Sequence, residues 1–394
     1  MRKTARFTAA IGAAALVGAA VTTTATASAR HDPGHRGGSA GHGHRGHHGS
    51  HGHHARLDRI FVIMLENHSK SSVIGDPYAP YLNKLADRHQ MAANYYGVTH
   101  PSMPNYIASI AGDNFGIQDD NDQNVVNFDR RNLVDQLERH HVRWDAYMDT
   151  LPANKLDRFA PDSTNPLYAK KHNPFVLFDD VKNNPARMRH VRDYSRLGHD
   201  LNGPKPPAFV WISPNQCHDM HGGVYGAVPG HPEAPCPYGS TKDDANDIAL
   251  KQKADAFVKG AVNTIRSSRA WTKRSAIVIV TDENDYTGTN DATGGNEETG
   301  GWETAEGCCD SPYVGAADPR ISADWPGGTY GGGLIPAIVV SPQARRHLVD
   351  HHEYNHYSLL TTIEDNWNMA HLGHAGDRLG GVRPMWPVFL GHGR

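Results

Sequence analysis

The chain has 394 residues, and 39 Lys plus Arg stand against 42 Asp plus Glu, for a formal net charge of −3 at pH 7. It has no basic stripe with interleaved aromatic residues, so we expect no nucleic-acid partner. After the N-terminal segment no run of about 18 apolar residues occurs, so we expect no integral membrane contact.

The N-terminus has the three parts of an export signal. Basic residues precede an Ala-, Val- and Gly-rich segment over 7–21, and Ala27-Ser28-Ala29 forms an A-x-A cleavage site. We predict a signal peptide over residues 1–29 that is cleaved after Ala29, and therefore a secreted protein.

Residues 30–56 are mainly Gly and His and contain almost no apolar side chains. Such a segment cannot bury a core, so we predict a disordered leader that could bind Zn or Cu loosely but is not needed for catalysis. Residues 57–394 have the composition of a folded protein, and we predict one catalytic domain there, acting as a monomer.

Short apolar runs alternate with helical patterns along this domain. Successive apolar, β-branched residues are typical of strands that are buried on both faces of a mostly parallel sheet. The predicted strands cover 59–65, 208–213, 276–281 and 335–341. The predicted helices cover 79–90, 131–141, 243–268 and 357–369. This alternation predicts an α/β fold, a doubly wound, mostly parallel central sheet with helices on both faces.

Polar and charged residues follow each predicted strand, where ligands bind in such folds. They are Glu66, Asn67 and His68 after the first run, Asn215, His218, Asp219 and His221 after the second, Asp282, Glu283, Asn284 and Asp285 after the third, and the segment "PQARRH" with His351, His352 and His356 after the fourth. Converging carboxylates repel one another unless a cation neutralises them. Oxygen-rich ligands with some imidazole predict a divalent metal ion, with Zn, Mg, Mn, Ca and Fe as candidates.

The stretch "THPSMPNYIASIAG" (99–112) has two hydroxyl residues ahead of an apolar run. Ser and Pro at that place are common helix-start signals. A hydroxyl there would also lie near backbone N–H groups and the positive end of the helix dipole, which favours a phosphate. With a metal beside it, the hydroxyl becomes a nucleophile without a histidine base. The combination points to phosphoryl transfer by hydrolysis.

The four cysteines allow three disulfide connectivities. Cys217 and Cys236 would close a short local loop, which leaves Cys308 and Cys309 as a vicinal pair or as partners of other segments.

Six segments resemble the bacterial phosphoesterase family of secreted acid phosphatases and phospholipase C enzymes, within the alkaline phosphatase superfamily. They are "VIMLENHS" (62–69), "THPSMPNYIASIAG" (99–112), "KHNPF" (171–175), "PNQCHDMHGG" (214–223), "VTDEND" (280–285) and "YNHYSLLTTIEDNW" (354–367). The resemblance is greatest to actinobacterial acid phosphatases, which include an enzyme acting on phosphatidylinositol 3-phosphate. It implies an alkaline phosphatase-like fold, a phosphate-ester substrate that extends to phosphoinositides, and an acid optimum.

The resemblance also implies roles for individual residues. Glu66 and Asn67 match a ligand pair after the first strand, and Asp282 and Glu283 match paired acidic ligands after the third. Ser102 stands two residues before the Pro-Asn of the helix start, the position of the nucleophile, and is also expected to bind the metal. Thr99 lies three residues before this position and therefore does not match the nucleophile.

Four further residues match positions near the phosphate: His221 is expected to be catalytic, and Asn105, His172 and His356 to bind substrate. Each imidazole could instead bind a second ion or protonate the leaving group, and Asn105 could only cap its helix. His100 is given no role beyond shaping the turn.

Two other functions compete with a phosphomonoesterase. A phospholipase C-type diesterase would use the same ligands and nucleophile with a different leaving group. An extracellular metal-binding protein would work through its His-rich leader instead. A sulfatase is disfavoured because its C/S-x-P-x-R context is absent.

Overall fold

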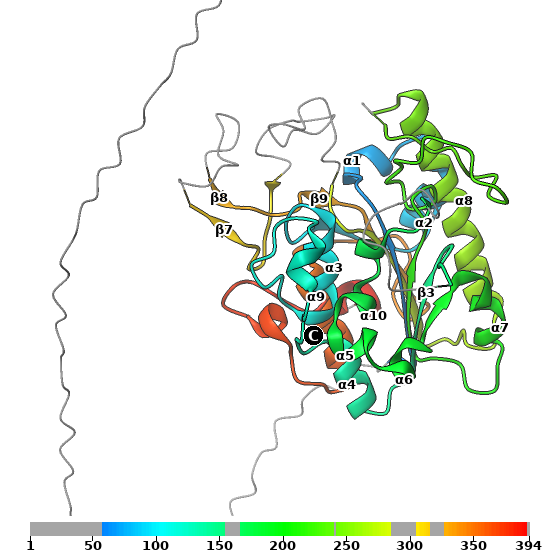
Figure 1. Ribbon diagram of the computed structural model, residues 1–394. Helices are drawn as coiled ribbons and strands as arrows, with labels where there is room; N and C mark the ends of the chain where they lie inside the picture. The colour runs from blue at the N-terminus through cyan, green and yellow to red at the C-terminus, as the bar shows by residue number, and fades with distance from the viewer. Residues whose placement is uncertain (1–56, 154–165, 240–241, 285–304, 316–326, 392–394) are drawn as a thin grey trace, which may run out of the picture. The chain divides into compact units, whose positions relative to one another are not determined.

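A nine-stranded sheet forms the centre of the computed structural model (Figure 1). The structure describes residues 57–153, 166–239, 242–284, 305–315 and 327–391. The predicted signal peptide and leader, and Asp285, lie outside these ranges.

The strands are β1 (Arg59–Leu65), β2 (Gln90–Tyr96), β3 (Trp144–Met148), β4 (Val191–Asp193), β5 (Phe209–Ser213), β6 (Ser275–Thr281), β9 (Leu334–Ile335), β10 (Ala337–Val340) and β11 (Leu348–Asn355). Their order across the sheet is β11-β2-β10-β6-β1-β5-β3-β4, and β9 pairs with β2. A separate two-stranded ribbon joins β7 (Tyr313–Val314) and β8 (Gly328–Thr329).

Helices cover both faces of this sheet. The α-helices are α1 (Lys70–Val73), α2 (Pro80–Arg88), α3 (Ser102–Ala111), α4 (Leu133–Arg139), α5 (Asp179–Lys182), α6 (Pro185–Met188), α7 (Leu197–Leu201), α8 (Ala245–Ser267), α9 (His356–Asn366) and α10 (Trp386–Leu390). The 3₁₀ turns are η1 (Asp122–Val125), η2 (Lys170–His172), η3 (Pro174–Leu177), η4 (Tyr194–Arg196) and η7 (Gly373–Gly376). In the described residues no helix is long and apolar enough to cross a bilayer.

The alternation of side chains along β1 divides the core into two layers. Ile60, Val62 and Met64 pack in the layer that contains α3, α4, α9 and α10, whereas Phe61 and Ile63 pack in the layer with α2, α7 and α8. Figure 1 shows α8 and α7 at one side of the sheet and α3, α9 and α10 at the other. A strand that is buried on both faces must be apolar at successive positions, so the doubly wound fold is confirmed.

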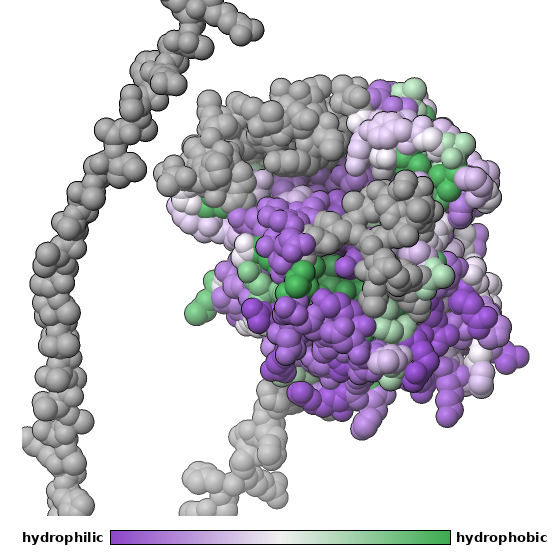
Figure 2. All heavy atoms as spheres, viewed as in Figure 1, coloured by the Kyte–Doolittle hydropathy of each residue, from purple (hydrophilic) through white to green (hydrophobic). Residues whose placement is uncertain are grey.

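The surface seen in Figure 2 is mostly hydrophilic, with small hydrophobic areas near the middle and at the left edge of the view. Few large apolar side chains of the described residues are exposed: Val126, Tyr225, Tyr313, Val349 and Leu379.

The fourth predicted run is the exception to the parallel pattern. Pro336 divides it into β9 and β10, and β10 runs antiparallel to both β2 and β6. Its carboxyl end therefore points to the opposite edge of the sheet, and the expectation that "PQARRH" joins the other polar residues is wrong. His351 and His352 are exposed on β11, and of the three histidines only His356 reaches the polar edge.

Candidate active site

The candidate site lies at the carboxyl edge of five parallel strands. Glu66 follows β1, Asp282 and Glu283 follow β6, the loop 214–223 follows β5, and Ser102 begins α3 after β2. His356 begins α9 directly after β11, which is parallel to β2. Because β10 is antiparallel, the strands on either side of it share one direction, and their carboxyl ends meet at one edge of the sheet.

Ser102 is the first residue of α3 and is 1 % exposed. Its Oγ lies 3.0 Å from Glu66 Oε2 and 3.1 Å from Glu283 Oε1, and its single O–H can donate to either carboxylate. Pro104 fits here because the first turn of a helix has no intrahelical partners for its N–H groups. The structure thus joins the predicted nucleophile to two predicted metal ligands.

Asn105 holds the turn that precedes α3. Its Oδ1 accepts hydrogen bonds from the N–H groups of Val98 and Thr99, and its Nδ2 donates to the carbonyls of Thr99 and Pro101. The side-chain amide is therefore engaged by the backbone of the turn before α3, although it caps no N–H group of α3 itself. Thr99 takes part in the turn, as expected.

The turn approaches the end of β6 through glycine. A Cβ on Gly97 would lie 2.8 Å from the Asp282 carbonyl oxygen and 2.8 Å from Gly332 Cα. A side chain at residue 97 would push the turn, and Ser102 with it, away from Asp282.

Glu66 also faces a second set of groups. Its Oε1 lies 3.3 Å from His172 Nε2, and His172 Nδ1 lies 3.3 Å from Asp219 Oδ2. Tyr106 stacks on the His172 ring, with centroids 5.3 Å apart. Glu66, His172 and His221 each present one donor atom, and these atoms lie within 4.8 Å of one another.

Asp282 is fixed by a neighbour in the segment after β1 and by one on α9. Its Oδ1 accepts a hydrogen bond from Asn67 N at 3.2 Å, and its carbonyl accepts one from His356 Nε2 at 2.6 Å. The other ring nitrogen of His356, Nδ1, accepts from the Tyr95 hydroxyl at 3.1 Å. Both nitrogens are therefore used, and the structure makes His356 a residue that positions Asp282 rather than one that faces substrate.

The buried carboxylates repel one another. Burial and the charge of Asp282 raise the pKa of Glu66 well above its usual range, and burial and the charge of Glu283 do the same for Asp282. Burial also raises the pKa of Asp219. Three ionised carboxylates in one buried place need a compensating cation.

The three predicted site histidines are neutral imidazoles. Burial lowers the pKa of His221 to about 3 and that of His356 to about 4, and burial together with the Lys171 charge lowers the pKa of His172 well below its usual value. A neutral imidazole can bind a metal or accept a hydrogen bond, but it has no second proton to donate to a leaving group.

The residues at the site fit a divalent metal ion. Six of the buried polar atoms at the site make no hydrogen bond to a described residue: Glu66 Oε1, Asn67 Oδ1, both ring nitrogens of His172, Asp219 Oδ2 and Asp282 Oδ2. Four of them only face one another at 3.3 Å, across His172–Glu66 and His172–Asp219. Unpaired buried polar atoms are costly, and carboxylate, amide and imidazole donors are those that hard and borderline divalent ions take.

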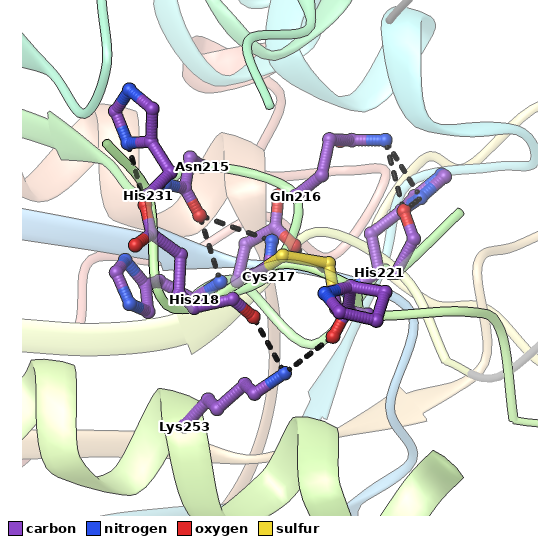
Figure 3. Close-up of a disulfide and its surroundings, with 12 residues drawn as sticks. Asn215, Gln216, Cys217, His218, His221, His231 and Lys253 are labelled. Atoms are coloured by element: carbon purple, nitrogen blue, oxygen red, sulfur yellow. Dashed lines mark hydrogen bonds and ion pairs between the residues drawn. A yellow bond between two sulfur atoms is a disulfide. The ribbon is translucent and has the colours of Figure 1, made fainter. Parts of the chain in front are cut away.

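A disulfide fixes the loop that contains Asp219 and His221. Cys217 in this loop is bonded to Cys236 (Figure 3). Gln216 Nε2 contacts His221 Nδ1 at 3.1 Å, and Asp219 Oδ1 accepts a hydrogen bond from the His221 N–H. The other two cysteines form the vicinal pair Cys308–Cys309, so the structure has one of the three connectivities that the sequence allows.

Two residues near this site have no site role predicted from the sequence. His100 Nδ1 is paired with Glu283 Oε2, although the sequence indicates no role for it beyond the turn. Lys171 lies within a quoted segment but is not among the predicted site residues, whereas Asp219 is among the carboxylates predicted to converge here. Lys171 directly precedes His172 in "KHNPF", which is the one sequence signal that could have drawn attention to it.

A family model describes most of the folded part of the chain. The model of the phosphoesterase family matches residues 76–231 and 237–370. The chain belongs to the phosphoesterase family. The match includes Ser102, His172, His221, Asp282 and Glu283, and it begins ten residues after Glu66.

The curated proteins to which the chain is similar bear the names of phosphatases. A probable acid phosphatase of Kluyveromyces lactis is 25 % identical over 82 % of this chain and 61 % of its own length. An acid phosphatase of Aspergillus fumigatus is 32 % identical over 42 % of this chain and 36 % of its own length. A phosphatidylinositol-3-phosphatase of Mycobacterium tuberculosis is 31 % identical over 42 % of this chain and 52 % of its own length. The matched regions span less than two thirds of the length of each of these relatives.

Solved structures with a similar chain path have low sequence identity. A protein of the alkaline phosphatase superfamily from Vibrio parahaemolyticus is 10 % identical, covers 81 % of this chain and 69 % of its own, and has a TM-score of 0.43. A phosphonate monoester hydrolase of Agrobacterium radiobacter is 12 % identical, and the match covers 86 % of this chain and 78 % of the hydrolase chain with a TM-score of 0.46.

Proposed function

We propose that the protein is a secreted, metal-dependent phosphomonoesterase of the acid phosphatase type in which Ser102 is the nucleophile. The observation that supports this most directly is the position of the Ser102 hydroxyl at the start of α3, in hydrogen-bond contact with Glu66 and Glu283. The acid phosphatases among the relatives support the monoester substrate.

Glu66, Asn67, Asp282, Glu283 and the Ser102 hydroxyl would hold the metal ion. His172, Asp219 and His221 adjoin this group through Glu66, and these neutral histidines would bind a second ion or phosphate oxygens. When bound, the metal lowers the pKa of a neighbouring hydroxyl and neutralises charge on phosphoryl oxygens.

The reaction proceeds by two in-line displacements at phosphorus. The Ser102 Oγ loses its proton to a carboxylate in contact with it, Glu66 or Glu283, and bonds to phosphorus while the ester P–O bond breaks. The departing alkoxide takes a proton from water. The hydroxide formed in this way attacks the phosphoserine, phosphate departs, and the Ser102 oxygen regains its proton from the carboxyl group that received it. The positive end of the α3 dipole would stabilise the phosphoryl charge.

His356 and His100 support this chemistry without contacting the phosphoryl group. His356 holds the Asp282 backbone from α9, and His100 pairs with Glu283. Such contacts set the orientation of metal ligands. A phosphoinositide belongs among the substrates to be tested, since a phosphatidylinositol-3-phosphatase is one of the relatives.

The test compares wild type with Ser102→Ala in metal-defined buffers. We expect wild-type protein to hydrolyse p-nitrophenyl phosphate and to lose activity on exhaustive dialysis against EDTA. Ser102→Ala should lower turnover by about 1,000-fold or more with an unchanged circular dichroism spectrum. Turnover near the wild-type rate in this variant would exclude Ser102 as the nucleophile.

Substrate class is tested on the same protein. Phosphatidylcholine and bis-p-nitrophenyl phosphate report on diesterase activity, and phosphatidylinositol 3-phosphate reports on phosphoinositides. Faster hydrolysis of the diesters than of p-nitrophenyl phosphate would replace the monoesterase with the phospholipase C-type alternative.

A further inference from the structure

Lys171 places a buried positive charge beside the candidate site. It lies in η2, directly before His172, and its side chain is 11 % exposed. The Nζ atom lies 2.7 Å from Asp120 Oδ2. Burying an ammonium group is costly, so a lysine in this position needs either a structural or a chemical reason.

Asp120 connects this ammonium group to the helix that begins with Ser102. Its other carboxylate oxygen, Oδ1, accepts a hydrogen bond from the backbone N–H of Met103 at 2.9 Å. Met103 is the second residue of α3 and follows Ser102 directly. The Lys171 Nζ is therefore joined, through one carboxylate, to the helix start where the phosphoryl group is expected.

The charge of Lys171 reaches the metal ligands. It opposes the rise in pKa that burial and neighbouring carboxylates cause at Glu66 and Asp282, and it helps burial to lower the pKa of His172 and His221. The ammonium group is thus close enough to interact electrostatically with the carboxylates and histidines of the candidate site.

Lys171 also has unused hydrogen-bond donors. A lysine ammonium has three N–H bonds. Within the described part of the chain, the Nζ atom makes a single hydrogen bond, to Asp120. Two of its N–H groups therefore make no hydrogen bond to a described residue, and the ligand that an anchored cation at a helix start favours is an anion with several oxygens.

We propose that Lys171 is a catalytic residue that donates hydrogen bonds to a non-bridging oxygen of the substrate phosphoryl group, and that Asp120 is the positioning residue that holds its ammonium at the start of α3. This proposal rests on the proposed function, because it assigns a phosphoryl group to the site. The alternative is an ion pair that only stabilises the fold.

The experiment compares four variants. Lys171→Met removes the charge and keeps most of the length, and Lys171→Arg restores a charge. Asp120→Asn removes the anchor. Lys182→Met is the matched control, because Lys182 lies in α5 and pairs with Asp179 at 2.6 Å, outside the site.

The first readout is kcat and KM with p-nitrophenyl phosphate. The second is the binding of inorganic phosphate, measured by calorimetry. For the binding measurement, each Lys171 variant and the control also carry Ser102→Ala. We expect Lys171→Met to lower kcat/KM by about 100-fold and to weaken phosphate binding by about tenfold. Lys171→Arg should recover part of both losses, and Lys182→Met should change neither. Asp120→Asn should lower kcat by about tenfold and have no further effect in Lys171→Met, because the two residues act as one unit.

Phosphate binding does not require turnover, so this readout separates the two proposals. If the wild type hydrolyses no phosphate ester, the proposed function fails. Even then, tighter phosphate binding by protein with Lys171 than by protein with Lys171→Met would support the proposed contact between Lys171 and a phosphate. Lys171→Met protein that is folded by circular dichroism and binds phosphate as tightly as its Lys171 parent would overturn the role of Lys171. Equal loss of melting temperature in Lys171→Met and Lys171→Arg, with phosphate binding intact, would show a structural ion pair.

Discussion

Glu364 gives a prediction about stability that can be worked out from its surroundings. The side chain lies in α9, is 0 % exposed, and accepts a hydrogen bond from the Leu372 N–H at 2.8 Å. Burial raises its pKa from 4.5 to about 8, although donors from Leu372 and Gln136 oppose this shift. The native protein therefore keeps this carboxyl protonated at pH values where the unfolded chain loses the proton.

The sign of the effect follows from the raised pKa. Below pH 4.5 both states hold the proton and the native state is not penalised. As the pH rises toward 8, only the unfolded state releases the proton, and stability is lost. The cost is about 1 kcal/mol at pH 5 and about 3 kcal/mol at pH 7, by the relation of 1.36 kcal/mol per pKa unit.

Glu364→Gln tests this reasoning, because a neutral amide keeps the acceptor for Leu372 and cannot ionise. Relative to wild type, we expect the variant to gain about 2 kcal/mol of unfolding free energy between pH 5 and pH 7. The measurement is urea unfolding followed by tryptophan fluorescence. Glu353→Gln, exposed on β11, is the control and should show no such gain. If the difference in unfolding free energy between Glu364→Gln and wild type is the same at pH 5 and pH 7, the reasoning is refuted.

Three other predictions concern residues around the site. Replacing Cys217 and Cys236 by Ala opens a loop with a sequence separation of 19 and should cost about 3 kcal/mol, measured by urea unfolding; a variant of unchanged stability would contradict it. Tyr95→Phe removes the hydroxyl bonded to His356 and should raise the metal concentration needed for half-maximal activity about tenfold, and an unchanged metal titration would count against the positioning role. Gly112→Ala introduces a Cβ 2.1 Å from a backbone oxygen at a φ of 71°, and should lower stability by about 2 kcal/mol in thermal melts, whereas an unchanged melting temperature would contradict the predicted clash.

The buried strands could be predicted because burial on both faces leaves a continuous apolar run. The run at 59–65 coincides with β1, and the run at 276–281 differs from β6 by one residue. Strands with polar positions have a weaker sequence signal: β11 has exposed residues 351–353, and β2 has half-buried positions among its buried ones. The direction of β10 could not be predicted either, because an apolar run has the same composition in both directions.

The acidic residues of the candidate site could be predicted as residues that follow buried strands. Glu66, Asp282 and Glu283 lie at strand ends in sequence and come together because those strands are parallel neighbours. Contacts between distant segments left no local signal. The pairing of His100 with Glu283 spans 183 residues and depends on the turn before α3 meeting the end of β6.

The antiparallel strand β10 sets the width of the site without adding a side chain to it. It lies between β2, which leads to Ser102, and β6, which leads to Asp282 and Glu283. Strands are spaced about 4.8 Å apart, so β10 keeps the nucleophile's strand and the acidic strand two strand spacings apart. A proline in place of Ile338 or Val339 would loosen the pairing of β10, and we expect it to alter the gap between Ser102 and the acidic residues Asp282 and Glu283 without changing any of these three side chains. The geometry of the proposed site therefore depends on the backbone of a strand that ends at the opposite edge of the sheet.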